Sequence, residues 1–369
     1  MDYVNDAVEK FRELIIEQLQ RCEKMKNSGE PKDFRKMDRI TIGIIDGDGI
    51  GPIIMKEAKR VLCNLLDDEI TRGKVVLEDI EGLTLENRME KGQALPLDVL
   101  EKIKKCDVLL KGPTTTPKGG TLESANVALR RELDLYANVR PVVVPEENID
   151  WIFYRENTEG EYVLGSRGVE LPGELAMDFK VTTDLGTRRI AKAAFDYAVA
   201  NGKTKVAVVT KANIMKKTDG NFSKICHQVA ENYEGIEVED WYIDIMTANL
   251  VNKEIRSQFQ VFLLPNLYGD IITDEAAEIQ GGVGTAGSAN IGDKYAMFEA
   301  IHGSAPRLIE EGKGDYANPS SILKATAMML RHIGYIDKAT VLEKALDESE
   351  IGNMTCNQFS DMIINKIKG

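Results

Sequence analysis

Short runs of aliphatic and β-branched residues alternate with longer amphipathic segments along most of the chain. The short apolar runs predict strands, and segments in which apolar residues recur every three or four positions predict helices. We expect strands at 40–45, 75–79, 108–111, 151–155, 205–210, 238–243 and 261–265. We expect helices at 52–66, 185–201, 221–232, 270–280, 319–334 and 339–346. Strands that alternate with helices are typical of an α/β fold.

The first 27 residues follow a pattern of their own. Apolar residues such as Val4, Val8, Phe11 and Ile15 recur at helical spacing, which predicts one amphipathic helix from residue 2 to about 27. The segment 27–31, Asn-Ser-Gly-Glu-Pro, ends it. We expect this helix to pack on the body of the protein or on a partner protomer, and a separate binding function is the alternative.

Length and composition narrow the class of protein. A chain of 369 residues predicts two domains, or one α/β unit with a large insertion. Its 43% hydrophobic and 29% charged residues are typical of a globular protein. The five cysteines form no Cys-x-x-Cys pair, and neither a secretory signal nor a long apolar span is seen. We therefore expect a cytoplasmic protein in a reducing compartment.

The formal net charge of −13 bears on the partners of this protein. It argues against general affinity for nucleic acid or for an anionic membrane, because both need a cationic surface. An anionic substrate would need a local group of arginines or a metal ion to overcome the overall charge.

Two glycine clusters have to be weighed as dinucleotide-binding loops. Residues 282–287 satisfy Gly-x-Gly-x-x-Gly, but the residues before them look helical, whereas the Rossmann fingerprint needs a strand there. The cluster 46–52 follows a strand, yet its two aspartates and its proline suit a tight turn better than a phosphate cradle. An ordinary Rossmann fold is therefore not expected.

Two aspartates stand four residues apart where a strand gives way to a helix. One helical turn brings Asp270 and Asp274 onto the same face, where adjacent carboxylates repel unless a cation lies between them. Oxygen ligands alone favour magnesium or manganese over zinc. Capping of the helix N-terminus by both aspartates is the alternative.

A basic stretch follows the hydroxyl-rich loop 112–120. It contains Arg130, and Arg140 and Arg155 come later in strands or loops. Several guanidinium groups that converge are the usual means of binding carboxylates, whereas for any one arginine a surface salt bridge is the more common explanation.

Taken together, these pieces resemble the isocitrate/isopropylmalate dehydrogenase family of β-decarboxylating dehydrogenases, from about Arg39 to the C-terminus. The resemblance rests on six blocks in family order, at 47–52, 130–141, 155–162, 211–215, 266–274 and 302–306. It implies a two-domain, isopropylmalate-dehydrogenase-like α/β fold with a large mixed sheet flanked by helices. The implied domains are a helical extension at 1–35, a large cofactor-binding domain at 36–137 and 281–369, and a small dimer-forming domain at 138–280.

The resemblance also implies roles for individual residues. Substrate is expected at Ser124, Asn126, Arg130, Arg140 and Arg155. The nicotinamide dinucleotide is expected at Thr116, Asn213, Glu299, His302, Gly303, Ser304, Ala305, Arg307 and Asn318. Mg²⁺ or Mn²⁺ is expected at Asp244, Asp270 and Asp274, with Lys211 as the base and Tyr162 as the acid of catalysis. It further implies a homodimer with shared active sites, to which Lys211, Asn213 and Asp244 cross from the partner.

Residues that differ within the family predict the substrate and cofactor. Ser124 and Asn126 stand where isopropylmalate enzymes carry leucines, which favours isocitrate over 3-isopropylmalate and leaves homoisocitrate and tartrate as alternatives. Arg307 could meet the phosphate of NADP, but Glu310 and Glu311 would repel it, so we expect NAD, with NADP as the alternative. A non-catalytic regulatory subunit is a further alternative, although a degenerate subunit would be expected to lose the metal aspartates, the tyrosine or the lysine.

Overall fold

The computed structural model describes residues 2–27, 29–117, 119–120, 122–164 and 167–369. The chain divides into two compact units. The first unit contains Met1–Glu30, Tyr136–Asn138 and Val143–Thr273, and the second contains Pro31–Leu135, Val139–Val142 and Asp274–Gly369. Strand β4 (Ala137–Val144) and helix α10 (Asn266–Ile279) contribute residues to both units.

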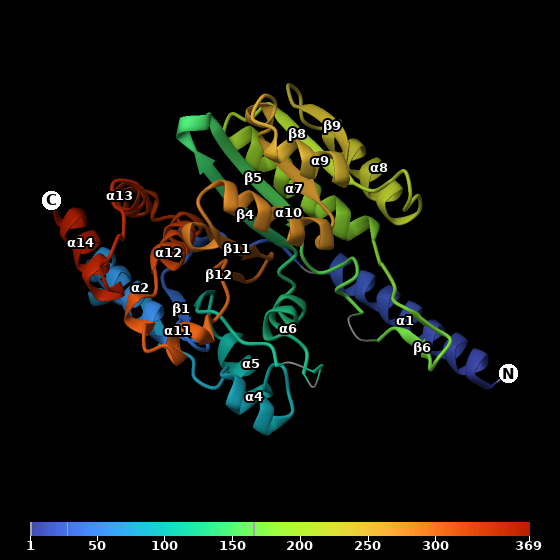
Figure 1. Cartoon of the computed structure of the whole chain (residues 1–369), viewed down its shortest axis with the longest axis horizontal. Helices are drawn as coiled ribbons and strands as arrows, with labels where there is room; N and C mark the ends of the chain where they lie inside the picture. Colours follow the sequence, from blue (N-terminus) through green and yellow to red (C-terminus); the bar gives the residue numbers. More distant parts are fainter. Residues whose placement is uncertain (1, 28, 118, 121, 165–166) are drawn as a thin grey trace. The chain divides into compact units, whose positions relative to one another are not determined.

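The second unit is an α/β layer structure (Figure 1). Its strands are β1 (Ile40–Ile45), β2 (Val75–Asp79), β3 (Val108–Lys111), β11 (Gly287–Ile291) and β12 (Ala296–Ala300). Its helices are α2 (Gly51–Leu65), α3 (Asp67–Thr71), α4 (Leu85–Lys91), α5 (Leu97–Ile103), α6 (Ala125–Glu132), α11 (Pro306–Glu310), α12 (Ser320–His332), α13 (Ile336–Asp347) and α14 (Cys356–Lys368).

The strands of the second unit lie in the order β2-β1-β3-β12-β11. All neighbours are parallel except β11 and β12, which pair antiparallel, so the sheet is mixed. Helix α12 packs on β11 and β12, and α2 packs on α12 and α14. Burial on both faces explains why β1 and β3 are almost continuous apolar runs.

The first unit has its own parallel strands and covering helices. Its elements are α1 (Asp2–Lys26), β5 (Ile149–Glu156), β6 (Val169–Leu171), β7 (Leu175–Met177), α7 (Asp184–Ala200), β8 (Lys205–Thr210), α8 (Thr218–Ala230), β9 (Glu237–Tyr242), α9 (Ile243–Val251) and β10 (Val261–Leu264). The order β5-β10-β8-β9 is parallel throughout. Its core contains the stacked rings of Phe153 and Phe262, whose centroids lie 4.3 Å apart.

The N-terminal helix α1 packs on the first unit, beside β6 and α7 (Figure 1). Leu14 is buried with Val163 and Leu164, and Phe11 stacks on Phe179. The prediction that this helix packs on the body of the protein is therefore confirmed. No helix among the described residues is long and apolar enough to cross a membrane.

The predicted elements agree closely with the structure. All seven strands and six helices exist, with ends shifted by a few residues at most. The cluster 282–287 follows helix α10, contains a 3₁₀ turn (Val283–Thr285) and runs into strand β11, so it lacks the strand-loop-helix context of a Rossmann fingerprint. The predicted α/β class, with a mixed sheet and no ordinary Rossmann loop, is confirmed.

Candidate active site

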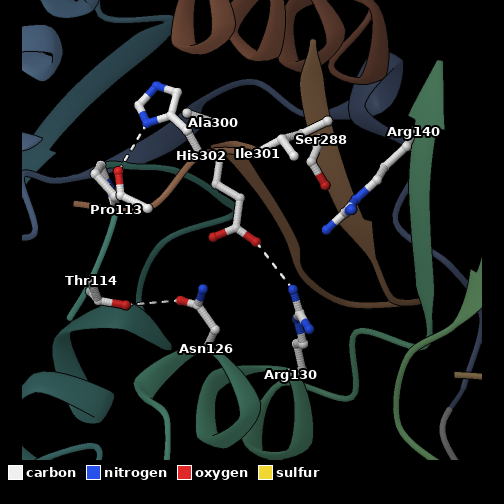
Figure 2. A pocket seen from close by; sticks show the side chains of 11 residues that line it. Pro113, Thr114, Asn126, Arg130, Arg140, Ser288, Ala300, Ile301 and His302 are labelled. Carbon is white, nitrogen blue, oxygen red and sulfur yellow. Dashed lines mark hydrogen bonds and ion pairs between the residues drawn. The ribbon is translucent and has the colours of Figure 1, made fainter. Parts of the chain in front are cut away.

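A polar pocket of about 110 Å³ opens in the second unit (Figure 2). Six residues that the sequence assigned to substrate or cofactor line it: Asn126, Arg130, Arg140, Glu299, His302 and Gly303. Its other lining residues are Pro113, Thr114, Ser288, Ala300 and Ile301. The folded chain thus brings residues of α6 and residues of the segment after β12, which are far apart in the sequence, into one cavity.

Two arginines enter this pocket from different elements. Arg130 comes from the last turn of α6 and Arg140 from β4, and each residue is less than a tenth exposed. Arg130 donates to Glu299 at 3.4 Å (Figure 2), and Arg140 donates to Asp274 at 3.0 Å. Neither arginine therefore forms an ordinary surface salt bridge, because a guanidinium group is rarely buried unless it makes specific interactions there.

Glu299 is the fixed negative charge of the pocket. Burial alone would raise its pKa, but the cations of Lys111 and Arg130 and hydrogen bonds from Lys111 and Asn290 lower the pKa of Glu299 to about 2. Among the residues that line the pocket, the guanidinium groups of Arg130 and Arg140 outnumber the carboxylate of Glu299. The pocket is therefore locally positive in a chain of charge −13, as an anionic ligand requires.

The glycine cluster 46–52 holds one wall of the pocket. The carboxylate of Asp48 accepts from the backbone N–H groups of Thr115 at 2.8 Å and Leu85 at 2.7 Å. A Cβ on Gly49, whose φ is +59°, would lie 2.0 Å from the carbonyl oxygen of Ser304. The cluster is a tight turn, as predicted, and it fixes loops that border the pocket. Asn126 completes this wall, because its Oδ1 accepts from Thr114 at 3.1 Å (Figure 2).

His302, which lines the pocket, carries a buried polar atom without a hydrogen-bond partner among the described residues. Burial lowers the pKa of His302, so the ring is neutral at pH 7, and its Nδ1 lies 3.0 Å from the carbonyl of Gly303. A carbonyl only accepts, so Nδ1 carries the proton and Nε2 is left as an acceptor. Nε2 is shielded from solvent and has no hydrogen-bond partner among the described residues.

The other residues assigned to substrate or cofactor do not line this pocket. Ser124 precedes α6, and Ser304 lies 2.6 Å from the Thr115 hydroxyl, with Ala305 after it in the left-handed region at φ 43°. Thr116 and Asn213 are exposed. Arg307 pairs with Glu311 one turn later, and Asn318 accepts from the N–H of Ser320.

A second cluster of predicted site residues lies in the first unit. Arg155, at the end of β5, is fully buried and donates to Asp270 on α10. The hydroxyl of Tyr162 donates to the other oxygen of Asp270 at 2.6 Å. Asn266, which the sequence did not single out, accepts from Arg155 Nε at 2.9 Å and Nη2 at 2.6 Å. The predicted acid, one clamp arginine and one metal aspartate therefore share a hydrogen-bond network.

The predicted base lies beside the third predicted aspartate. Lys211, in the turn after β8, pairs with Asp244 in the first turn of α9, with 2.6 Å between Nζ and Oδ1. Lys211 lowers the pKa of Asp244, which therefore stays ionised. The lysine and the aspartate expected to cross together to a partner protomer are thus adjacent.

The residues present fit a hard divalent cation by their chemistry. Asp270 and Asp274 lie one turn apart on α10 and offer carboxylate oxygen only, which suits Mg²⁺ or Mn²⁺. Among the described residues, no three His, Cys, Asp or Glu side chains of one chain gather at metal-binding distance. Asp270 and Asp274 supply at most two protein ligands from the same chain, and further ligands would have to come from elsewhere.

Glu156 is buried in the middle of the block 155–162. Its carboxylate accepts from the N–H groups of Thr158 at 3.0 Å and Glu159 at 2.6 Å. Burial, aided by the charge of Glu159, raises the pKa of Glu156 to about 7, although Arg21 and other groups oppose this. Two buried carboxylates, those of Glu156 and Glu159, therefore lie close together in this block.

We expect this raised pKa to make stability fall as the pH rises. The native state keeps the Glu156 proton up to about pH 7, whereas the unfolded chain releases it near the usual value of 4.5. The free energy of unfolding should thus fall between those pH values, by ~3 kcal/mol at most. Glu156→Gln, whose side chain does not ionise, should lose less stability between pH 5 and pH 8 than the wild type does.

Urea unfolding followed by tryptophan fluorescence tests this, because both tryptophans, Trp151 and Trp241, lie in the first unit. An equal difference in stability at pH 5 and pH 8 would contradict the assignment of the titrating group.

Comparison with known proteins defines the class. The isocitrate/isopropylmalate dehydrogenase family model matches residues 41–357, so the chain belongs to this family. The predicted family and the predicted class of enzyme, an NAD(P)-dependent β-decarboxylating dehydrogenase, are confirmed.

Three curated relatives show the range of the family. A mitochondrial protein of Dictyostelium discoideum, named as a regulatory subunit of NAD isocitrate dehydrogenase, is 38% identical over 90% of this chain and 92% of its own length. An NADP isocitrate dehydrogenase of Rickettsia bellii is 42% identical over 82% of this chain, which spans 62% of that enzyme. A homoisocitrate dehydrogenase of Methanocaldococcus jannaschii is 35% identical over 89% of this chain and 98% of its own length.

A solved structure agrees with the fold. The crystal structure of isocitrate dehydrogenase from Methylococcus capsulatus matches with a TM-score of 0.79 and 33% identity, over 89% of this chain and all of that one. The family's fold, predicted from six sequence blocks, is therefore present here.

Proposed function

We propose that the protein oxidises and decarboxylates isocitrate to 2-oxoglutarate with reduction of NAD, in the presence of Mg²⁺ or Mn²⁺. One observation carries the proposal: Asn126, Arg130 and Arg140 line one locally positive pocket together with the segment 302–303. Substrate-type and cofactor-type groups thus meet where a hydride would pass from one ligand to the other.

The polar lining favours a tricarboxylate over an apolar substrate. Buried arginines at 130 and 140, with Arg155 as the third member of the clamp, match the carboxylates of isocitrate. Asn126 and Ser124 would hydrogen-bond the third carboxylate, and an isopropyl group there would leave these polar side chains unpaired. Homoisocitrate, which is one methylene longer, is the nearest competitor, and 3-isopropylmalate and tartrate fit less well.

Two of the clamp arginines already bind carboxylates of the protein, and carboxylates of the substrate would replace these. In the structure, Arg155 is bound to Asp270 and Arg140 to Asp274. Substrate carboxylates would take the place of these aspartates at the arginines, and the freed aspartate oxygens would be available for a divalent cation. When bound, such a cation would lower the pKa of the 2-hydroxyl and withdraw electrons during decarboxylation.

Proton transfers fall to two side chains in this proposal. Lys211 accepts the proton of the 2-hydroxyl, directly or through water, while hydride leaves C2 for the nicotinamide. Tyr162 donates its proton to the carbon that loses carbon dioxide, and the short hydrogen bond to Asp270 orients its hydroxyl. Asp244 holds the Lys211 side chain in place, and the amine accepts the substrate proton only in its deprotonated form. The pairing is consistent with both side chains acting together from a partner protomer in a homodimer.

The electrostatics of the segment after Ala305 favour NAD over NADP. Arg307 is the first cation after Ala305 in the sequence. It already pairs with Glu311, which also binds Lys313. This exposed ion pair compensates the Arg307 charge only in part, but the adjacent carboxylates of Glu310 and Glu311 would repel a 2′-phosphate. We further propose that the second unit binds the cofactor and that the first carries the dimer interface. The cytoplasmic location stays a prediction.

The proposal is tested by the absorbance of reduced nicotinamide at 340 nm. Purified protein with isocitrate, NAD and Mn²⁺ should reduce the cofactor, and excess chelator should abolish the rate until Mn²⁺ is restored. NADP and homoisocitrate, tested in parallel, should give kcat/KM values lower by about tenfold or more. No reduced cofactor with any of the four family substrates would contradict the enzymatic function.

A second candidate is a regulatory subunit, which the name of the Dictyostelium discoideum relative favours. Tyr162, Lys211, Asp244, Asp270 and Asp274 are all present, and a regulatory protein without catalysis would not need them together. A protein that binds isocitrate in calorimetry without turnover would support this second candidate.

A further inference from the structure

Arg21, near the C-terminal end of helix α1, contacts the block 155–162 directly. Its guanidinium donates to Glu159 Oε1 at 3.0 Å and to the hydroxyl oxygen of Thr158 at 3.1 Å. The Arg21 side chain is 18% exposed, whereas Arg12 on the same helix is 65% exposed and pairs only locally with Glu9. Arg21 is therefore part of the packed structure and Arg12 is not.

Glu159 is held from two sides. The N–H group of Thr183 donates to its carboxylate at 2.8 Å, and the Thr183 hydroxyl donates as well. A Cβ on Gly186 would lie 2.3 Å from Glu159 Oε1, so the glycine leaves room for this carboxylate. Arg21 supplies positive charge on the remaining side, next to the buried Glu156. Without it, the Glu159 carboxylate would lie beside the buried acid Glu156 with less compensation of its charge.

A chain of hydrogen bonds leads from Glu159 to the proposed catalytic groups. The backbone carbonyl of Glu159 accepts from Asn266 Nδ2 at 3.0 Å. Asn266 Oδ1 in turn accepts from Arg155 Nε and Nη2, and Arg155 donates to Asp270. Glu159, Asn266 and Arg155 are each at most 3% exposed, so water does not easily replace a lost contact.

We infer that Arg21 is a positioning residue: by anchoring Glu159, it sets the place of Asn266 and thereby of the Arg155 guanidinium. Helix α1 lies outside the matched family region, 41–357, and would thus serve as an arm that organises the site from outside the family fold. The effect on turnover rests on the proposed function, whereas the effect on the structure of the block 155–162 does not.

The test compares Arg21→Gln, the conservative Arg21→Lys, and Arg12→Gln as a matched control on the same helix. Arg21→Gln should lower kcat/KM for isocitrate by about 3- to 30-fold, with KM for NAD unchanged, because most of the proposed cofactor-binding residues lie in the other unit. Arg21→Lys keeps the charge but lacks the planar guanidinium, whose two nitrogens reach the two acceptors separately, so it should recover part of the loss. Arg12→Gln should behave as the wild type.

Hydrogen exchange of the amides in 155–162 supplies a readout that needs no activity. These amides should exchange faster in Arg21→Gln than in the wild type or in Arg12→Gln, with the overall unfolding midpoint little changed. If the wild type is active and Arg21→Gln shows the same turnover and the same hydrogen exchange, the inference is overturned and the proposed function stands. A general loss of cofactor affinity and stability, without recovery in Arg21→Lys, would also overturn it. An inactive wild type would refute the proposed function, and exchange would then decide the positioning role alone.

Discussion

A Lys211→Met variant is expected to lower kcat for isocitrate oxidation by about 10³ to 10⁴, because it removes the proposed proton acceptor. The lysine is partly exposed and pairs with Asp244, which is also exposed, so the fold should be unaffected. KM for isocitrate should change little, and thermal unfolding should be that of the wild type. Initial rates across pH 6 to 10 are the measurement.

The matched control for this variant is Lys216→Met, which removes an exposed lysine from the same loop. It should retain wild-type rates. If Lys211→Met and Lys216→Met were equally active, Lys211 would have no part in proton transfer, and the shared-site dimer would lose its main support.

An Arg130→Gln variant is expected to lower kcat/KM for isocitrate by about 10³. Removal of one partner from a buried, charge-assisted pair costs about 2–5 kcal/mol, and about 4 kcal/mol corresponds to a thousandfold. Binding of NAD should weaken far less, although Glu299 would then rely on Lys111 and Asn290 alone. Steady-state kinetics with each substrate varied separately would show this.

Arg131→Gln is the natural control, because Arg131 is the next residue, is 42% exposed and pairs with Glu123 at the surface. Comparable losses in Arg130→Gln and Arg131→Gln would indicate a general effect on α6 and would contradict the substrate clamp.

Three of the strands that the sequence pattern did not predict contribute residues to the pocket, whereas β6 and β7, which were also missed, do not. The strands found in advance, such as β1, β3 and β8, are buried apolar runs bounded by polar residues. The missed strands β4, β11 and β12 carry Arg140, Asn290 and Glu299, and β4 also contains Pro141. Side chains selected for the pocket therefore mask the strand pattern where the site lies.

Two residues of the site could not be assigned a role from the sequence. Lys111 ends a predicted strand but gave no sign that its ammonium would be buried against Glu299. Asn266 stood inside a recognised block without an assigned role, and its bonds to Arg155 appear only in three dimensions.

The amino-acid pattern alone was sufficient for the α/β class, the N-terminal amphipathic helix, the absence of a Rossmann loop and the family itself. These follow from local periodicity and from short blocks, which are properties of neighbouring residues. The tertiary structure alone decided that Arg130 and Lys111 share Glu299, that Arg155 and Tyr162 share Asp270, and that Arg21 binds Glu159, 138 residues away. Such pairings depend on which buried charges the folded chain brings within hydrogen-bond distance, and no spacing along the sequence encodes that distance.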